Sequence, residues 1–339
     1  MVKRINSIDI LRMIAALAVV MVHGCAENVY VNAVSRFAVP IFFMISGYFY
    51  CVSKEKQKLR IKKMFILMIA VNLAFFCFAF FIAFIKGNVG SYLTETFTIK
   101  NIVKFIFFNE SKFGAYGAHL WFLSALLYCM IIDYFLSGFF NKRKKCCAAV
   151  IVILFLGYFV IEKYSPLLVN LNFSALCVRN FLFFGLPYFW LGKLFRNIDV
   201  AKIKLNNIVL ILSIILLAVM TLAEKYMLIA YFELNGARDQ YIFTIFLALA
   251  IFILALKNPL ENPNKISGFI ALSGRKYSLG IYIIHPIILK CLATAVSAVG
   301  ITFKGILLAM AAFAASWLIV ALYYFVKEKV KTYVSRKDC

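Results

Sequence analysis

Charged residues are scarce in this chain. They make up 15% of its 339 residues, and only 14 side chains are acidic. A soluble domain is about 25% charged and about 45–50% apolar, whereas this chain is 64% hydrophobic. A soluble fold of this length cannot bury so much apolar surface, which excludes a soluble enzyme. No hydrophilic stretch is long enough for a separate catalytic domain, so we expect one integral membrane domain over residues 1–339.

Several motifs are also absent. The nine cysteines form no C-x-x-C pair, so neither a disulfide framework nor a metal site is indicated, and we expect no metal. There is no Walker or dinucleotide-binding glycine pattern and no G-x-S-x-G serine element. The first apolar run begins with Asp9 and Arg12 and is followed by no small-residue cleavage site. We therefore expect it to be a membrane span and not a cleaved signal peptide.

What the chain has instead is a series of apolar segments, each close to the roughly 17–25 residues that cross a bilayer as a helix. Hydropathy predicts an all-α fold, a polytopic membrane bundle of about ten transmembrane helices. The predicted spans are residues 8–26, 34–52, 64–86, 118–140, 146–163, 174–195, 207–223, 240–256, 276–298 and 303–327.

The basic residues set the orientation. Lysine and arginine number 37 and the net charge is +23, a balance that would suggest nucleic acid in a soluble protein. With both termini in the cytoplasm, 25 basic residues fall in inner segments or at the inner ends of spans, and 8 in outer segments or at the outer ends of spans. This is the bias of the positive-inside rule. The charge therefore indicates topology and contact with anionic lipids, and gives no support to nucleic-acid binding.

Polar residues within spans are costly and often mark function. In the first span, Asp9 and Arg12 are three residues apart and can form an ion pair. His23 lies eleven residues beyond Arg12, on nearly the same helix face and about 16 Å further along the axis. The plainer interpretation is an inner-interface salt bridge and a histidine in the outer interface.

Three further cationic or titratable groups lie near the outer membrane level. Arg36 begins the second predicted span, His119 begins the fourth, and Arg179 lies early in the sixth. Each alone is typical of an interface anchor. Together with His23 they favour one cavity lined by four helices. Glu27, four residues after His23, is placed to orient or ionise that histidine.

Other intramembrane positions allow two interpretations. His285 precedes Pro286, which predicts a kinked helix, and it is either a site residue or a satisfied core histidine. Asp133 lies deep in the fourth span with no local partner, in a proton-carrying or a structural role. Ser46 and Gly47 are typical of close helix packing.

Four blocks of this chain resemble those of the acyltransferase 3 family, in the family's order and over nearly the whole length. The first is Ile8–Arg12 with the Arg-x10-His spacing that ends at His23. The others are Ser35–Tyr48, His119–Leu123 and Tyr277–Pro286.

The resemblance implies a bacterial inner (plasma) membrane O-acyltransferase. It would move an acyl group, most often acetyl, from cytoplasmic acyl-CoA to a hydroxyl of an extracytoplasmic or lipid-linked glycan. It implies that His23 is catalytic, with Arg12 as its partner in the motif, and we add Asp9 to the catalytic set as the residue that can pair with Arg12. A basic Arg-x-Arg of the family handles acyl-CoA, and its match here is Arg60-Ile61-Lys62. The residues assigned to substrate binding are Arg36, His119, Trp121, Arg179, Ser46 and His285.

One departure from the family pattern keeps an alternative open. Leu126 and Leu127 stand where many members have a glutamate pair. This places the chain near surface-glycan O-acetyltransferases and near the membrane half of the serine transporter/racemases of vancomycin resistance. The alternative function is therefore transport of serine or another small polar solute. A purely structural role accounts poorly for the intramembrane charges.

Overall fold

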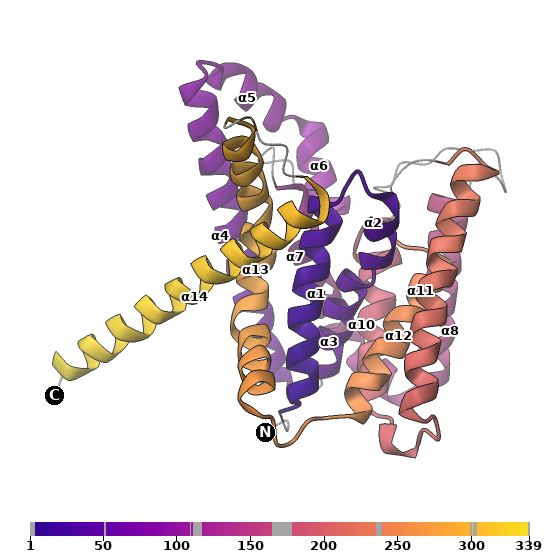
Figure 1. The fold of residues 1–339 in the computed structure, drawn as a ribbon. Helices are drawn as coiled ribbons and strands as arrows, with labels where there is room; N and C mark the ends of the chain where they lie inside the picture. Colours follow the sequence, from indigo (N-terminus) through magenta and orange to yellow (C-terminus); the bar gives the residue numbers. More distant parts are fainter. Residues whose placement is uncertain are drawn as a thin grey trace. The chain divides into compact units, whose positions relative to one another are not determined.

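The computed structural model describes residues 4–50, 52–108, 110, 117–164, 178–234, 239–298, 300 and 304–337, and their regular secondary structure is entirely helical (Figure 1). The chain divides into two compact units. The first comprises the described parts of Lys3–Val39 and Leu205–Cys339, and the second those of Pro40–Lys204. An all-helical fold is expected in lipid, because a helix satisfies its own backbone hydrogen bonds.

The first unit is built around α1. This helix packs against α13 along its length, and also contacts α2, α12 and α14, while α11 packs on α12 and α2. The helices of this unit are α1 (Asn6–Gly24), α2 (Val29–Ser35), α11 (Asn207–Ala230), α12 (Ile242–Lys257), α13 (Lys265–Ala298) and α14 (Gly305–Lys337).

The second unit pairs α7 with α4, and α10 with α8. Its elements are α3 (Ala38–Phe49), α4 (Lys54–Ile85), α5 (Val89–Thr96), α6 (Ile99–Phe108), η1 (Ala118–Leu120), α7 (Trp121–Lys142), α8 (Lys144–Tyr158), η2 (Phe159–Lys163), η4 (Phe181–Gly185), α10 (Leu186–Arg196) and η5 (Val200–Lys202). Here η2 and η4 are short π-helices, and η1 is a 3-10 turn.

Local sequence sets several helix ends. Asn28 and Asn206 cap α2 and α11, each side chain accepting from a backbone N–H at 3.0–3.1 Å. This is the capping that asparagine favours. Gly87 has a φ of +67° just after α4, a left-handed conformation that costs glycine little, so the helix ends there.

Eight helical segments among the described residues are long and apolar enough to cross a membrane, which supports the polytopic bundle. They match eight of the ten predicted spans. The other two correspond to α12, which has 16 residues, and to α10 with its preceding π-turn. Part of the predicted span 174–195 lies outside the described residues. The cytoplasmic placement of both termini stays a prediction.

Several helices are longer than their predicted spans. α4 begins at Lys54 and not at residue 64, α13 begins at Lys265 and not at 276, and α11 continues to Ala230 and not 223. Hydropathy detects only the lipid-embedded part of a helix, whereas backbone hydrogen bonding continues into charged turns. The extension of α11 matters, because it carries Glu224 and Lys225 into the unit's interior.

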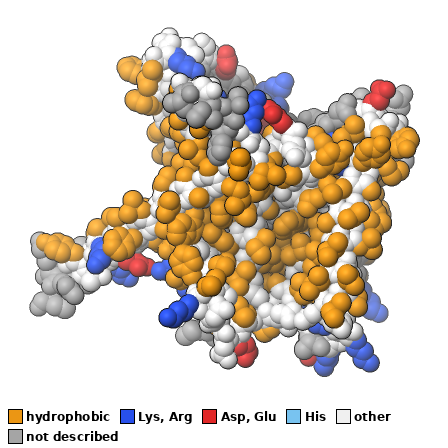
Figure 2. Space-filling model, viewed as in Figure 1, with side chains coloured by type: hydrophobic (Ala, Val, Ile, Leu, Met, Phe, Trp, Pro, Cys, Tyr) orange, Lys and Arg blue, Asp and Glu red, His pale blue; other side chains and the backbone are white. Residues whose placement is uncertain are grey.

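Apolar side chains cover the outer surfaces of the helices, and lysine and arginine gather toward the ends of the visible face (Figure 2). Only 17% of the most apolar stretch of α11 is buried, whereas 67% of the corresponding stretch is buried in the segment Ala118–Phe140, which contains α7. α7 is therefore central within its unit, and α11 presents most of its surface to lipid. No residue of α6 is buried, which fits an interfacial helix better than a re-entrant one.

Candidate active site

The start of α1 is held by side-chain hydrogen bonds to the end of α12 and the residues after it. Asn6 Nδ2 donates to the carbonyl oxygen of Leu260 at 2.7 Å, and Ser7 Oγ donates to that of Ala255 at 2.6 Å. These bonds fix the first turn of α1, the turn that carries Asp9.

Asp9 is the acceptor in an ion-pair group. Its side chain is 6% exposed. Oδ1 accepts from Arg12 Nη1 at 2.9 Å, and Oδ2 lies 3.4 Å from Nε of Arg4. The predicted Asp9–Arg12 pair is confirmed, and Arg4 is an additional partner. Two guanidinium groups face one carboxylate, so this end of α1 keeps a net positive charge.

A glycine lets α13 approach the backbone of this turn. A Cβ added at Gly274 would lie 1.9 Å from the carbonyl oxygen of Asp9, a distance at which a side chain cannot fit. The two helices therefore cross with their backbones in contact, as small residues allow in membrane proteins. The position of Asp9 is set by this crossing.

His23, at the end of α1, lies beside His285 of α13. The ring centroids are 5.1 Å apart and the ring planes are tilted by 50°. His285 is fully buried, whereas His23 is exposed. One imidazole thus has a fixed, enclosed position, and the other stands in front of it where a substrate can reach it.

The sequence Tyr282-x-x-His285-Pro286 fixes the tautomer of His285. Its Nδ1 lies 2.7 Å from the carbonyl oxygen of Tyr282 and 3.2 Å from that of Ile281. Both partners can only accept, so Nδ1 carries the proton. Pro286 has no N–H to donate to Tyr282, and the histidine takes that place. In the neutral ring, Nε2 is therefore the unprotonated nitrogen.

Arg36 is held in a polar group that connects α2 to α1. Its Nε and Nη2 donate to Oδ1 of Asn32 at 3.0 and 2.8 Å, and its Nη1 donates to Asp239 at 3.0 Å. Asn32 in turn donates to the carbonyl oxygen of Val22 at 2.7 Å. Asn32 thus joins Arg36 to the residue before His23. The i,i+4 spacing of Asn32 and Arg36 is visible in the sequence, but no spacing indicates Asp239.

Glu224 and Lys225 form a second buried polar position in this unit, and sequence reasoning missed it. Their exposed fractions are 8% and 1%. The two carboxylate oxygens of Glu224 accept from the backbone N–H groups of Ile242 and Phe243 at 3.1 and 3.3 Å. Glu224 therefore caps the start of α12, where a negative charge is favourable. Hydropathy had placed both residues beyond the span, so their burial was not expected.

In the second unit, Trp121 and Arg179 are brought together. The guanidinium carbon of Arg179 lies 5.2 Å from the centroid of the Trp121 ring, a cation–π arrangement. Trp121 also packs edge-on against Phe184 at 5.3 Å. His119 is 3% exposed, and its ring centroid is 5.4 Å from that of Phe75.

Ser46 and Gly47 lie where α3 meets α10. Ser46 Oγ donates to the carbonyl oxygen of Phe42 in its own helix at 2.7 Å. A Cβ at Gly47 would meet the carbonyl oxygen of Phe189 at 1.8 Å, and one at Gly192 would meet that of Met44 at 1.9 Å. The two glycines sit in a reciprocal backbone contact, which confirms the helix-packing interpretation of Gly47.

Arg60 and Lys62 lie in the first three turns of α4. Arg60 Nη1 donates to the carbonyl oxygen of Phe49, and its side chain is half-buried, whereas Lys62 is exposed. Only Arg60 is anchored by the protein, and Lys62 is available to solvent or lipid headgroups.

Asp133 has a partner that the sequence did not reveal. Its Oδ1 and Oδ2 accept from Lys193 Nζ of α10 at 2.7 and 2.9 Å, and Oδ1 also accepts from the indole of Trp190 at 3.2 Å. Asp133 is 0% exposed and Lys193 is 3% exposed. Sequence analysis had counted Lys193 among the inner-segment charges, but it is enclosed within the unit and neutralises Asp133.

The predicted site residues thus fall into two sets. Asp9, Arg12, His23, Arg36 and His285 belong to the first unit. Those of the second unit are Ser46, Arg60, Lys62, His119, Trp121 and Arg179. The single cavity lined by His23, Arg36, His119 and Arg179 stays a prediction. Among the described residues, no group of three or more His, Cys, Asp or Glu side chains is placed to hold a metal ion.

These features define a multi-pass, all-helical membrane protein with enclosed ion pairs and a histidine pair. The family model for the acyltransferase domain of the acyltransferase 3 family matches residues 5–325. The chain belongs to this family and is a membrane acyltransferase. No curated protein and no solved structure matches it.

Proposed function

We propose that this protein is an O-acyltransferase of a bacterial inner (plasma) membrane. It transfers an acyl group, acetyl in the first instance, from cytoplasmic acyl-CoA to a hydroxyl of an extracytoplasmic or lipid-linked glycan. The observation that carries the proposal is the pairing of exposed His23 with buried His285, at ring centroids 5.1 Å apart. An accessible imidazole with a fixed neighbour suits proton transfer from a hydroxyl.

In the proposed reaction, His23 is the general base. A ring nitrogen of His23 takes the proton of the acceptor hydroxyl while its oxygen attacks the thioester carbonyl. A C–O bond forms, the tetrahedral oxyanion collapses, and the C–S bond breaks. The thiolate of coenzyme A leaves and takes up the proton that His23 had accepted. Donors placed near the oxyanion lower the barrier, and the proposed donors are Arg36, His119 and Arg179.

His285 acts in this proposal as a positioning residue. Its Nδ1–H is committed to the carbonyl oxygen of Tyr282 at 2.7 Å, so the ring does not turn. His285 packs against His23, and when the His285 ring is neutral its Nε2 carries no proton. The ring of His23 is thereby held in one orientation toward the acceptor hydroxyl. Trp121 and Ser46 are assigned to further contacts with the acceptor in this proposal.

The proposed roles of the remaining residues follow from charge. Arg12, oriented by Asp9 at 2.9 Å, adds positive charge to the inner end of α1. Arg60 and Lys62 attract the phosphates of acyl-CoA to the start of α4. Anionic lipids contact the same basic surface.

The test is acyl transfer in proteoliposomes with radiolabelled acetyl-CoA and a lipid-linked glycan acceptor. We expect His23→Ala to lose at least about a hundredfold in rate, the usual size of a general-base contribution. Ile14→Ala is the control, since Ile14 lies on the same helix with 49% of its side chain exposed. Full activity in His23→Ala would reject the catalytic assignment.

One observation favours the alternative function. A buried ion pair within spans, such as Asp133–Lys193, is common along substrate and ion pathways. The competing proposal is a transporter of serine or another small polar solute. It predicts labelled serine flux into proteoliposomes without any acyl-CoA, and no retention of labelled acetyl-CoA by the purified protein. The proposed acyltransferase predicts that the purified protein retains labelled acetyl-CoA and that no labelled serine flux occurs.

A further inference from the structure

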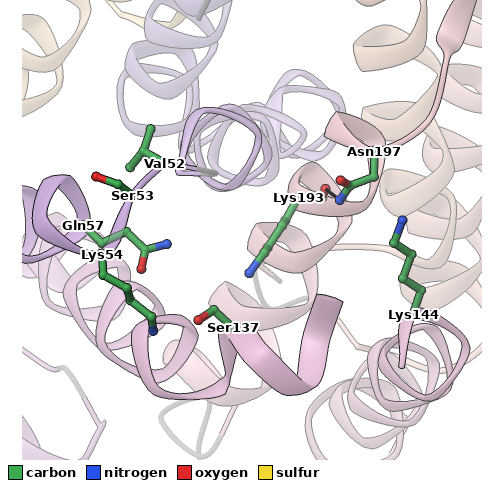
Figure 3. A pocket seen from close by; sticks show the side chains of 8 residues that line it. All are labelled: Val52, Ser53, Lys54, Gln57, Ser137, Lys144, Lys193 and Asn197. Atoms are coloured by element: carbon green, nitrogen blue, oxygen red, sulfur yellow. Dashed lines mark hydrogen bonds between the residues drawn. The ribbon is translucent and has the colours of Figure 1, made fainter. Parts of the chain in front are cut away.

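The second unit contains an open pocket that none of the assignments above uses. Its volume is about 680 Å3, within the roughly 300–1,000 Å3 of small-molecule sites. It lies among the starts of α4 and α8 and the ends of α7 and α10 (Figure 3). The lining residues are Val52, Ser53, Lys54, Gln57, Ser137, Lys144, Lys193 and Asn197.

The lining is strongly cationic. Three of these eight residues are lysines and none is acidic. Lys193 reaches toward the space between Gln57 and Ser137 (Figure 3), and it is held from behind by the enclosed carboxylate of Asp133 at 2.7 Å. A buried lysine fixed in this way has little freedom left to lose when an anion binds.

Helix dipoles largely offset one another at this pocket, because α4 and α8 begin there while α7 and α10 end there. Lys54 is the first residue of α4, and Lys144 is the first residue of α8. Since Asp133 balances the charge of Lys193, the net positive charge of the lining comes from Lys54 and Lys144, and it favours an anionic ligand.

A buried amide at the pocket leaves one acceptor open to a hydrogen-bond donor. Gln57 is 4% exposed, and its Nε2 donates to the carbonyl oxygen of Tyr50 at 3.4 Å. Its Oε1 is enclosed and accepts no hydrogen bond from any residue that the structure describes. A buried acceptor without a partner is costly. A fully deprotonated anion cannot supply that hydrogen, but an amino, amide or hydroxyl group on an organic phosphate can.

We infer that this pocket binds an organic phosphate whose non-phosphate part donates to Gln57 Oε1. Resting on the proposed function, the ligand is the adenosine phosphate end of coenzyme A, and a phospholipid headgroup is the other source of the same chemistry. Lys54, Lys144 and Lys193 hold the phosphates. Arg60 and Lys62, further along α4, do not line the pocket. Their proposed role is limited to attracting the ligand toward it.

The experiment measures binding without catalysis. The probe is adenosine 3′,5′-bisphosphate, which has no acyl group or thiol, titrated calorimetrically into the full-length protein in phosphatidylcholine nanodiscs. We expect Lys54→Gln and Lys144→Gln each to weaken binding roughly three- to tenfold, the loss of one charged contact. Lys145→Gln is the matched control, because this exposed neighbour does not line the pocket. Unphosphorylated adenosine should not compete.

A second arm identifies the source of the phosphate. Native mass spectrometry with added phosphatidylglycerol would show a retained lipid that is lost in Lys144→Gln but not in Lys145→Gln, if the headgroup is the natural ligand. Weaker binding of the bisphosphate in Lys144→Gln supports a coenzyme A site, and loss of the retained lipid in Lys144→Gln supports a lipid headgroup site. No effect in both arms, or equal competition by adenosine, overturns the phosphate site. Intact binding in a protein that transfers no acyl group would reject the proposed function alone.

Discussion

His285 stands behind His23 with the two ring centroids 5.1 Å apart, and its Nδ1 is bound to the carbonyl oxygen that Pro286 leaves without a helical donor. The two histidines come from opposite ends of the chain. Because α1 and α13 cross with their backbones in contact at Gly274, the helix that carries one imidazole also fixes the position of the other.

Two substitutions of His285 separate a structural role from a positioning role. His285→Asn keeps a short side-chain N–H that can donate to Tyr282, but it has nothing at the place of Nε2. We expect it to retain its unfolding temperature while kcat falls about 10- to 100-fold and KM for acyl-CoA is unchanged. His285→Gln places an amide near the level of Nε2 and should restore part of kcat.

The pH profile of kcat/KM provides the second measurement for this pair. If His285 positions His23, replacing His285 changes the apparent pKa in the pH profile of kcat/KM as well as the maximum value of kcat/KM. Variants with a lowered unfolding temperature but an unchanged kcat and pH profile would show that His285 only fills the helix interface.

Pro286→Ala tests how the tautomer is held. Alanine restores a backbone N–H, which then competes with His285 Nδ1 for the carbonyl oxygen of Tyr282. The helix should gain stability, because an internal proline costs about 3 kcal/mol, while His285 keeps only its 3.2 Å contact to Ile281. We therefore expect a higher unfolding temperature together with lower turnover. Turnover equal to that of the native protein would mean that this hydrogen bond does not orient the pair.

Much of this arrangement can be predicted from the sequence, because membrane helices follow local rules. Apolar runs located the spans, and the three-residue spacing predicted the Asp9–Arg12 pair that the structure confirms at 2.9 Å. Ser46-Gly47 predicted close packing, and Gly47 does contact the backbone of Phe189. Each of these features depends on residues near one another in the chain or on one helix face.

The remaining features depend on contacts between distant helices. No spacing relates Asp133 to Lys193, or Arg36 to Asp239, so their partners emerge only in three dimensions. Hydropathy also ends a span at the first charge, which concealed the burial of Lys225. A lysine that pairs within a unit has the same sequence signal as one that faces the cytoplasm.

Gly274→Ala tests the crossing of α1 and α13. The added methyl would lie 1.9 Å from the carbonyl oxygen of Asp9, so one helix has to move. The free energy of unfolding should therefore fall by about 1–3 kcal/mol. Gly268→Ala in the same helix is the control, since its Cβ would meet nothing closer than Pro263 at 3.8 Å. We expect a lower unfolding temperature for the first variant and an unchanged or higher one for the second. Equal behaviour of the two would show that α13 does not press on the Asp9 turn.

Asp133 and Lys193 allow a double-mutant cycle that bears on function as well as stability. Asp133→Leu leaves the ammonium of Lys193 enclosed without a counter-charge, and Lys193→Met leaves the carboxylate, so each should cost about 3–5 kcal/mol. The double variant has two apolar side chains in contact and should lose far less than the sum. Additive losses in thermal unfolding would contradict the pairing.

The activity of the stable double variant then separates the two proposed functions. In a transporter that moves protons or solute past this pair, removing both charges abolishes flux even though the fold is intact. In the proposed acyltransferase, the reacting groups centre on His23, and Asp133 serves to hold Lys193 in the pocket. Acyl transfer should therefore continue, with a raised KM for acyl-CoA and a kcat close to that of the native protein, as measured in the proteoliposome assay.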